Sequence, residues 1–436
     1  MSREMKRANL PGEEYIPESW ETPRLKDNAY FINGDRGKNY PSGEDIKTEG
    51  IPFLTSDNIH SSIVDIARDG AKYITEEKYN SMHGAKLRIN DLIYCLRGSV
   101  GLCALNKELT QGTIASSLVV IRPKATVIPE FLNYVMNSAV IQQQNDNYMN
   151  GSCAANLSAE NVRNYNMPFP QIEEQKAIVS FLSVHCAYVD SAISKHQQII
   201  EKLEEYRKAV ITQAVTKGLN PNVEMKESSI PWVKSIPAEW SEQPLKILFN
   251  NRKNKNTDCA EVNLLSLSYG RIIRKDINSN EGLLPENFSG YNIIEPNDIV
   301  LRLTDLQNDH RSLRTGLVTE HGIITSAYVT LCPKTDINSE YYHYLLHSYD
   351  IQKVFYTLGE GIRQSLKYED LSKVLVPVPS RKEQDDIVRY LNGLSETVDK
   401  AIDKHNQLIS KLQEYKQSLI YNAVTGKIDC TTEASV

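Results

Sequence analysis

The sequence predicts an α+β protein in which two globular domains are separated by two long paired helices, related by a pseudo-two-fold internal repeat. Its 436 residues are too many for one ordinary hydrophobic core, so two or three domains are expected. A long helical segment is written twice, and a short motif ending in tryptophan opens each half. The stretches between these shared parts differ strongly, which indicates one frame carrying two different domains.

The repeated helical segment is the strongest pattern in the chain. KHQQIIEKLEEYRKAVITQAVTKGL at residues 195–219 aligns without a gap with KHNQLISKLQEYKQSLIYNAVTGKI at residues 404–428, an offset of 209, and 12 of the 25 positions are identical. A Pro-x-Pro-x-x-x-Glu-Gln lead-in precedes each copy, at residues 168–175 and 377–384. The repeat therefore includes both the helix and the segment that enters it.

The tryptophan motif is the second repeat. EMKRANLPGEEYIPESW at residues 4–20 aligns with EMKESSIPWVKSIPAEW at residues 224–240, an offset of 220. Weaker echoes survive between the repeats: NDLIY at 90–94 with NDIVL at 297–301, ASSLVVIRPK at 115–124 with TSAYVTLCPK at 325–334, and NLSAENV at 156–162 with SLKYEDL at 365–371. A plain duplication would also leave repeats, but it would not explain why the frame matches while the domains diverge.

The two helical copies carry an a/d heptad pattern. Their seam positions step by four and three residues, which is typical of a coiled coil. The predicted seam contains Leu182, Val189, His196, Leu203 and Tyr206 in the first copy and Leu391, Val398, His405, Leu412 and Tyr415 in the second. Proline precedes each segment, and Gly218 and Gly426 end them. The pattern does not fix whether the two helices run parallel or antiparallel.

His196 and His405 fall near the middle of the predicted seam. The simplest interpretation is a polar residue that sets the register of the coil. A metal-binding or pH-sensitive role is the alternative, although no nearby cluster of Cys or carboxylates supports it. If the helices are antiparallel, these two histidines should lie close to each other near the pseudo-two-fold axis.

The repeats define the predicted domain boundaries. The chain divides into residues 1–166 (first globular domain), 167–219 (first coiled-coil helix), 220–375 (linker and second globular domain), 376–428 (second coiled-coil helix) and 429–436 (tail).

Composition places the chain among ordinary globular proteins, with 40% hydrophobic and 24% charged residues. No run of 18 apolar residues predicts a transmembrane helix, and the N-terminus lacks the apolar core of a secretory signal. The seven cysteines are scattered singly, so a reducing cytoplasm is expected and no membrane partner. The net charge of −6 weighs mildly against nucleic acid as the only partner, although local basic patches can override it.

No catalytic or metal motif stands out in the sequence. A phosphate-binding G-x-x-x-x-G-K-[ST] loop is absent, as are an Asn-Pro-Pro-aromatic tetrapeptide and a nuclease-like set of carboxylates and lysine. His343 and His347 are spaced as two metal ligands on a helix, but no third ligand is evident, and a packed amphipathic helix is the simpler interpretation. The chain is therefore predicted to be non-catalytic, with no metal site and no cofactor of its own.

Polar and basic segments in both divergent domains are the candidates for reading DNA. Arg can pair bidentately with guanine and Asn with adenine, while Lys and backbone groups hold phosphates. The candidate residues are Arg36, Lys38, Asn39, Tyr40, Ser56, Asn58, Arg97 and Ser99 in the first domain, and Arg252, Lys253, Asn254, Lys255, Tyr269, Arg271, Arg302, Asn308, Arg311, Arg314, Arg363 and Gln364 in the second. For any single residue, a solvated loop side chain is the competing interpretation, so the clustering in both halves is the stronger argument.

The whole pattern resembles the DNA-specificity subunit of Type I restriction-modification systems. The resemblance rests on the Pro-x-Pro-x-x-x-Glu-Gln lead-ins, the paired KLxEY helices and the KGLNPNVEMKESSIPWVKSIPAEW stretch at residues 217–240. GIPFLTSDNI at residues 50–59 and RLTDLQNDHRSLRTG at residues 302–316 also look like segments of the family's target-recognition domains. Each motif alone is moderately specific, but their duplicated order is very specific.

The resemblance implies a mechanism. Two target-recognition domains would each read one half of a bipartite, asymmetric site in double-stranded DNA, and an antiparallel coiled coil would set the spacer between the halves. Two modification subunits would dock on this chain and bring S-adenosylmethionine, and two restriction subunits would bring ATP and Mg²⁺. Two alternatives remain: a coiled-coil scaffold without sequence-specific DNA binding, and a self-contained enzyme whose catalytic residues converge only in space.

Overall fold

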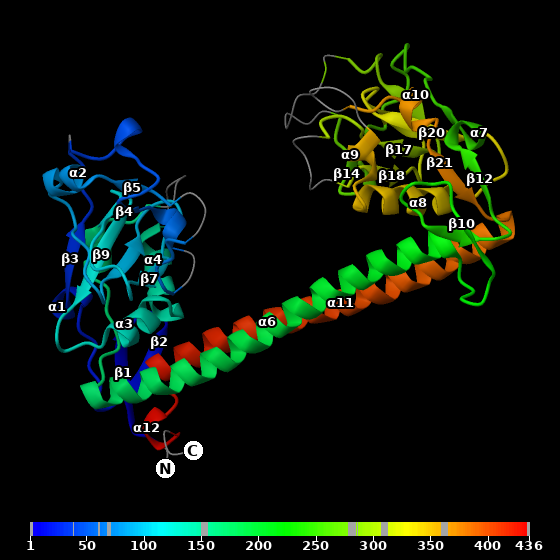
Figure 1. The fold of residues 1–436 in the computed structure, drawn as a ribbon. Coiled ribbons are helices and arrows are strands. Elements are labelled where there is room, and N and C mark those ends of the chain that lie inside the picture. The colour runs from blue at the N-terminus through cyan, green and yellow to red at the C-terminus, as the bar shows by residue number, and fades with distance from the viewer. Residues whose placement is uncertain are drawn as a thin grey trace. The chain divides into compact units, whose positions relative to one another are not determined.

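The computed structural model describes residues 3–37, 39–59, 62–67, 71–149, 156–277, 285, 287–306, 313–358 and 365–433. They form two compact units, each with one globular domain (Figure 1). Unit 1 contains Met1–His196 and Gln407–Val436, and unit 2 contains Gln197–Asn406. Each unit therefore takes half of each long helix, whereas the predicted division kept each helix whole.

Two long helices, α6 (Ile172–Lys217) and α11 (Arg381–Val424), occupy the repeated segments. Prolines in the lead-ins precede them, and both end at a glycine in the left-handed region, Gly218 at φ 72° and Gly426 at φ 73°. In α6, 46 residues correspond to about 70 Å of helix. The helices therefore begin after the prolines and end before the glycines, as predicted from the sequence.

Within each unit the two helices run antiparallel. In unit 1 the first half of α6 lies beside the last half of α11, and in unit 2 the last half of α6 lies beside the first half of α11 (Figure 1). One ion pair bridges them in each unit, between Asp190 and Lys416 at 2.7 Å in unit 1 and between Arg207 and Asp399 at 2.6 Å in unit 2. The sequence left this direction open, and the family resemblance gave it correctly.

Four of the ten predicted seam residues are buried as expected. Leu182, Val189, Leu391 and Val398 are at most 7% exposed. Leu203 and Leu412 are half-buried, as are His196 and His405, which belong to different units, so their mutual approach stays a prediction.

Tyr206 and Tyr415 were wrongly placed on the seam, because they are 52% and 54% exposed. The following residues, Arg207 and Lys416, are half-buried and make the ion pairs between the helices. Long basic side chains can bury their aliphatic stems while the charged head reaches a carboxylate. The seam therefore moves by one residue at these positions.

The core of unit 1 is built on a four-stranded antiparallel sheet in the order β3-β9-β6-β7. Beside it lie a three-stranded sheet, β5-β4-β8, and the hairpin β1-β2 formed by the tryptophan motif. The strands are β1 (Met5–Leu10), β2 (Glu13–Pro17), β3 (Ala29–Asn33), β4 (Ile51–Leu54), β5 (Tyr73–Ile74), β6 (Leu92–Cys95), β7 (Cys103–Leu105), β8 (Thr113–Ile114) and β9 (Leu118–Pro123). The helices are α1 (Leu25–Asn28), α2 (Glu76–Ser81), α3 (Pro129–Met136), α4 (Ala139–Met149), α5 (Ala159–Arg163) and α12 (Cys430–Glu433), with 3-10 turns at Gly43–Asp45 and Ser56–Asn58.

Unit 2 repeats the central sheet, in the order β13-β20-β17-β18. Two-stranded pairs, β14-β15, β16-β19, β12-β21 and β10-β11, surround it. The strands are β10 (Met225–Glu227), β11 (Ser235–Pro237), β12 (Ser241–Pro244), β13 (Phe249–Asn251), β14 (Leu265–Ser268), β15 (Arg271–Arg274), β16 (Asn292–Ile294), β17 (Ile299–Leu301), β18 (Thr315–Leu317), β19 (Gly322–Ile324), β20 (Val329–Pro333) and β21 (Leu375–Val378). The helices are α7 (Leu245–Leu248), α8 (Ser339–Ile351), α9 (Val354–Leu358) and α10 (Tyr368–Leu371).

The tryptophan motif fastens each domain to the start of the helix that follows it. Trp20 is fully buried and its indole N–H donates to Glu174 at 2.8 Å, and Trp240 donates to Glu383 at the same distance. Each Trp also lies against the C-terminal glycine of the other long helix, Trp20 at Gly426 and Trp240 at Gly218 in their respective units. The two tryptophan motifs therefore make equivalent contacts in the two units.

The glutamine of each lead-in has an equally specific partner set. Gln175 accepts a hydrogen bond from the backbone N–H of Ile128 at 2.9 Å and donates to the carbonyl of Pro170 at 3.0 Å. Gln384 accepts from the N–H of Asn338 at 2.8 Å and donates to the carbonyl of Pro379 at 3.0 Å. Both amides are buried, so the Glu-Gln pair orients the domain on the helix by satisfied buried hydrogen bonds.

Among the described residues, α6 is the one helix long and apolar enough to cross a membrane by length and composition, with a window of mean hydropathy 1.4. Ile178, Leu182 and Cys186 on this helix pack into the core of unit 1 against Leu419 and Val424 of α11. These contacts place this part of α6 in the core of unit 1.

Candidate nucleic-acid interface

One edge of the central sheet collects the predicted DNA-reading residues of unit 1. In the antiparallel register Asn33 at the end of β3 faces Val119, and Cys95 at the end of β6 faces Leu118 at the start of β9. The segments that leave β3 and β6 and enter β9 therefore meet at this edge. It is the end of the sheet away from α6 (Figure 1).

Arg36 and Arg97 are two exposed cations at this edge among the residues that the structure describes. Arg36 follows β3, and its guanidinium donates to the carbonyl of Ser116 at 3.5 Å. Arg97 follows β6 and forms a β-bridge with Asn156. The neighbouring backbone N–H of Leu96 donates to the carbonyl of Ser117 at 2.9 Å, so both arginine loops are tied to the same short segment before β9.

Ser56 and Ser99 lie near Arg97. Ser99 is exposed, and a Cβ placed at Gly98 would lie 3.9 Å from the hydroxyl oxygen of Ser56, which is half-buried. Gly98 has a φ of 75°, a conformation that favours glycine. The edge of unit 1 thus presents two guanidinium groups and two hydroxyl groups on loops held by a rigid sheet.

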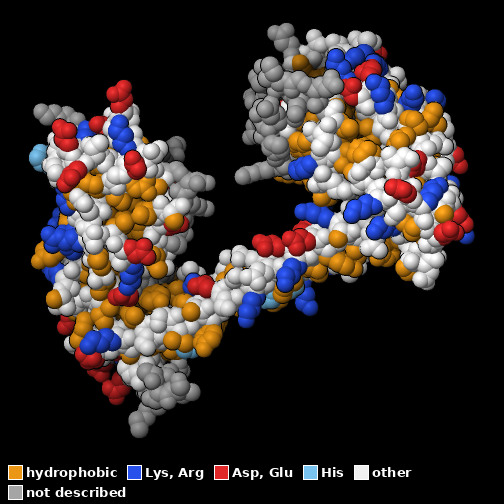
Figure 2. Space-filling model, in the orientation of Figure 1, with side chains coloured by type: hydrophobic (Ala, Val, Ile, Leu, Met, Phe, Trp, Pro, Cys, Tyr) orange, Lys and Arg blue, Asp and Glu red, His pale blue; other side chains and the backbone are white. Residues whose placement is uncertain are grey.

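The equivalent edge of unit 2 contains a cavity of about 490 Å³. Lys253 and Lys255 follow β13, Lys367 precedes α10, and all three are exposed at its wall, with Glu369 as the one acidic lining residue. Asn254 is also exposed, and Arg302, after β17, is half-buried. Lys and Arg side chains gather over the α10 and β20 end of unit 2 (Figure 2).

The β14-β15 hairpin presents an aromatic and a basic side chain at its tip. Tyr269 is 82% exposed and precedes Gly270 and Arg271. Tyr269 and Gly270 have φ values of 45° and 78°, as in the tight two-residue hairpin turns that match strand twist. The short turn fixes both side chains on a stiff support.

Three of the predicted residues make contacts within the domain, and their contact with DNA stays a prediction. Asn39 donates to the carbonyl of Ser81 at 2.8 Å, and Tyr40 packs edge-to-face on Phe53. Asn58 is buried: its amide oxygen accepts from the N–H of Thr55 at 2.9 Å and its amide nitrogen donates to the carbonyl of Asp65 at 3.2 Å. These three were predicted from polar loop composition, which does not distinguish a DNA contact from a loop-stabilising hydrogen bond.

Arg314 is a clear correction, whereas Arg252 lies in the wall of the unit 2 cavity with an internal partner, and its DNA contact stays a prediction. Arg252 pairs with Asp298, whose carboxylate is buried, at 3.0 Å. Arg314 is 0% exposed, and its guanidinium donates to the carbonyls of Arg302 at 3.1 Å and Thr304 at 2.9 Å and lies over the ring of Tyr356. A guanidinium committed to internal carbonyls is not available to a base edge. Lys38, Asn308, Arg311, Arg363 and Gln364 lie outside the described residues.

No group of three His, Cys, Asp or Glu side chains suited to a metal occurs among the described residues. His343 and His347 of α8 stack with their ring centroids 6.2 Å apart. Burial lowers the pKa of each imidazole to about 4, with the neighbouring cations of α6 adding to the shift at His347. Both imidazoles are therefore neutral at pH 7, which fits buried side chains of a packed helix.

Sequence reasoning missed a basic groove along β3 of unit 1. Its cavity of about 520 Å³ has Lys26, Arg88, Arg122 and Arg163 in its wall, beside the exposed ring of Tyr30. These residues come from four separate segments with no local motif. Only the sheet register, which pairs Tyr30 with Arg122, brings them together.

Comparison with known proteins identifies the fold. Residues 17–205 match the family model described as Type I restriction modification DNA specificity domain. A type I restriction enzyme specificity subunit of Methanocaldococcus jannaschii is 24% identical over 432 residues, which cover 96% of this chain and 95% of that protein. The EcoBI specificity subunit of Escherichia coli is 24% identical over 293 residues, covering 62% of this chain and 60% of that protein.

Two solved structures have the same fold. One, from work on the complex assembly and conformational transition of the type I R-M system, superposes with a TM-score of 0.67 at 17% identity, covering 95% of this chain and 99% of that one. The HsdS subunit of Thermoanaerobacter tengcongensis gives a TM-score of 0.50 at 17% identity and covers 96% and 99% of the two chains.

The duplicated frame and its two divergent domains define the class: a recognition protein in which one helix pair carries two specificity domains. Over nearly its whole length the chain is similar to specificity subunits of Type I restriction-modification systems, and it has their fold.

Proposed function

We propose that each globular domain of this specificity subunit reads one half of a bipartite, asymmetric sequence in double-stranded DNA. The observation that carries the proposal is the contrast between the units. Their frames make the same contacts, down to the Trp–Glu hydrogen bonds of 2.8 Å, while the loops at the sheet edge differ strongly in sequence. A shared frame with unlike loops suits a protein that must present two different readers in a fixed relation.

The exposed cations and amides at the two sheet edges are the proposed contacts. Arg36, Arg97 and Ser99 would serve unit 1, with Ser56 beside them. Lys253, Asn254, Lys255, Tyr269 and Arg271 would serve unit 2, with Arg302 behind them. Arginine and asparagine offer the bidentate pairings that distinguish guanine and adenine, and lysine supplies phosphate contacts. Placing them on loops of a rigid sheet gives the adaptable tips and fixed support that recognition needs.

The antiparallel helix pair is the proposed ruler between the half-sites. It also offers two equivalent faces on which two modification subunits could dock. Those subunits would bring S-adenosylmethionine for adenine methylation, and two restriction subunits would bring ATP and Mg²⁺. In this proposal the specificity chain itself is non-catalytic, binds no cofactor and works in the cytoplasm.

A domain exchange tests the proposal directly. Residues 21–165 are replaced by the equivalent domain of another specificity subunit, and methylated adenines are mapped by long-read sequencing in cells that also contain the modification subunit. The expected result is a change in one half-site only. A change in both halves would contradict two independent readers.

The competing scaffold hypothesis is tested with purified protein. Binding is measured for the mapped site and for a scrambled duplex of the same length, across a range of salt concentrations. A scaffold without a DNA role predicts no preference for the mapped site and no salt dependence. Methylation by this chain without any partner would instead revive the self-contained enzyme.

A further inference from the structure

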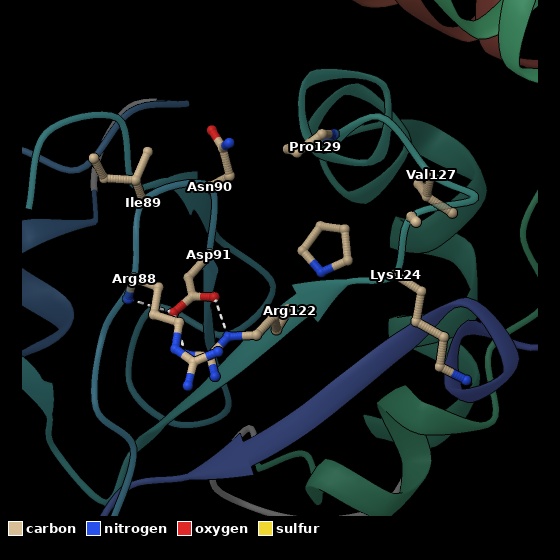
Figure 3. A pocket seen from close by; sticks show the side chains of 10 residues that line it. Arg88, Ile89, Asn90, Asp91, Arg122, Lys124, Val127 and Pro129 are labelled. Carbon is tan, nitrogen blue, oxygen red and sulfur yellow. Dashed lines mark hydrogen bonds and ion pairs between the residues drawn. The ribbon is translucent and has the colours of Figure 1, made fainter. Parts of the chain in front are cut away.

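The basic groove of unit 1 lies beside edge strand β3, away from the loops proposed to read bases. Of the eight described residues that line its cavity of about 520 Å³, four are Lys or Arg and none is acidic. A second cavity of about 280 Å³ adjoins it and shares Arg88 and Arg122 as its wall (Figure 3). Blue side chains gather along the β3 margin of unit 1 in the space-filling view (Figure 2).

The arginines of the groove differ in whether an acidic side chain pairs with them. Arg122 makes two hydrogen bonds to Asp91, at 2.7 and 2.8 Å, and this partner raises the pKa of the guanidinium (Figure 3). Arg163 pairs loosely with Glu160 at 3.4 Å on the surface. Within the described part of the chain, the exposed side chain of Arg88 makes no hydrogen bond or ion pair, although its backbone N–H donates to Asp91. Arg88 therefore presents an uncompensated positive charge.

Lys26 and the ring of Tyr30 complete the groove, and Lys124 lies in the wall of the adjoining cavity. Lys26 is held by a neutral acceptor, the side-chain oxygen of Asn164, at 2.8 Å, so its charge also remains uncompensated. Lys124 donates to the carbonyl of Asp27 at 2.8 Å and lies 5.2 Å from the ring centroid of Tyr30. Tyr30 is 59% exposed. Fixed cations beside an exposed ring suit a polyanion rather than a small neutral ligand.

The cations of this groove are mostly not repeated at the aligned positions of unit 2, although unit 2 has the same strands. The repeat alignment places Glu295 where unit 1 has Arg88, Cys332 where it has Arg122, Asn250 where it has Tyr30 and Ser372 where it has Arg163. The two lysines alone are kept, as Lys246 and Lys334. Glu295 is moreover occupied by His321 at 2.9 Å. The charge at the centre of the groove is thus reversed between the units.

We propose that this groove binds the phosphodiester backbone of DNA beside the half-site read by unit 1, so that the two halves of the complex hold their DNA unequally. The proposal rests on the proposed function. It is supported by continuity, because β3 leads from Tyr30 to the loop of Arg36 within six residues, about 20 Å of extended chain. Phosphates carry no sequence information, so the groove would add affinity without changing the sequence read.

The test uses the full chain assembled with its modification subunits. Its probes are two duplexes of equal length, one with the mapped bipartite site and one scrambled. Lys26→Gln with Arg88→Gln removes the two uncompensated charges, and Lys246→Gln is the matched control in unit 2. Circular dichroism and thermal denaturation confirm that each variant is folded. Fluorescence anisotropy at several salt concentrations gives the slope of log affinity against log salt.

The double variant should weaken both duplexes by similar factors, on the order of tenfold at 0.1 M salt, and reduce the magnitude of the salt slope by about 2, since each phosphate contact contributes about 0.9. The preference for the mapped site and the methylated sequence should stay unchanged, and Lys246→Gln should behave as wild type. An unchanged slope, a loss confined to the mapped duplex, or an equal loss from Lys246→Gln would each overturn the proposal. If wild type does not prefer the mapped duplex, the proposed function fails instead, because the groove is tested on either duplex.

Discussion

The ammonium group of Lys416 donates to both carboxylate oxygens of Asp190 at 2.7 Å, joining the end of α11 to the start of α6 in unit 1. Unit 2 contains the same relationship at the repeat offset of 209, where Arg207 donates to Asp399 at 2.6 Å. Each helix thus supplies the cation in one unit and the carboxylate in the other. That exchange is what an antiparallel pair of equivalent helices requires.

These two ion pairs should each contribute weakly but measurably to stability. In a double-mutant cycle, Asp190→Ala and Lys416→Ala should show a coupling energy of about 0.2–1 kcal/mol, because both side chains remain partly exposed. Arg207→Ala should cost more than Lys416→Ala, since Arg207 also pairs with Glu204 at 2.6 Å. Thermal unfolding at low and high salt measures both effects. A coupling energy of zero in both units would show that the pairs do not stabilise the helix pair.

Trp240 should be essential to the attachment of the domain in unit 2. Trp240→Phe removes the N–H that donates to Glu383, a carboxylate whose pKa is raised by burial, and leaves a gap around the ring. We expect a loss of about 2–4 kcal/mol in the free energy of unfolding, measured by urea denaturation. Glu383→Gln is the control, because it keeps an acceptor for Trp240 while removing the buried charge. It should cost clearly less than Trp240→Phe, and the opposite order would contradict this account.

Arg314 separates a structural role from a DNA contact. The guanidinium fork bonds two backbone carbonyls and the hydroxyl of Tyr356 at 3.1 Å, a geometry that lysine cannot reproduce. Arg314→Lys should therefore lower the free energy of unfolding by about 1–3 kcal/mol without altering the methylated sequence. Denaturation and methylation mapping together give the answer. Full stability with a changed half-site would restore Arg314 as a base-reading residue.

The same residue illustrates what sequence alone could predict. The repeats and the heptad pattern predicted the long helices and the two domains, because these features recur at regular intervals in the sequence. The antiparallel direction of the helices came from the family resemblance. No repeating sequence pattern indicates whether a single side chain is exposed. Arg314 and Arg97 both sit in polar loops, and only the fold decides that one is buried under carbonyls while the other is exposed. Either Tyr206 or the adjacent Arg207 could occupy one seam position. Arg207 occupies it because its guanidinium pairs with Asp399 on the facing helix.

The groove beside β3 was invisible for a related reason. Lys26, Arg88, Arg122 and Arg163 are spread over more than 130 positions of the chain and meet only through sheet pairing. The global charge of −6 gave no hint of them. The comparison between the two units, which the repeat makes possible, is what distinguishes a unit-specific basic surface from an ordinary spread of charges.

His321 should make unit 2 more stable at acid pH. A hydrogen bond to Glu295 raises the pKa of His321, and the charge of Glu261 at 2.8 Å adds to the shift. A raised pKa means that the stabilisation is fully present below the unfolded value of about 6.5 and is lost as the pH rises through the folded value. The Tm difference between wild type and His321→Gln should therefore shrink above about pH 6.5. A difference that grows with pH would have the wrong sign for this ion pair.

The ruler predicts how the recognised sequence responds to the length of the helices. Equal insertions of four or seven residues after Ile199 in α6 and after Asn406 in α11 lengthen both helices by about 6 or 10.5 Å and leave the ion pairs of each unit intact. Because successive base pairs are about 3.4 Å apart, the spacer between the half-sites should become longer, and more so for seven residues than for four. Seven residues also keep the heptad phase, whereas four shift it.

Methylation mapping reads the spacer and both half-sites in one experiment. Inserting seven residues into α6 alone is the control, since unequal helices cannot keep both Asp190–Lys416 and Arg207–Asp399 in register, and methylation should be lost. With equal insertions, both half-sites should stay unchanged because the sheet edges are untouched. Intact methylation at the original spacing would mean that something other than the helix pair measures the distance between the two readers.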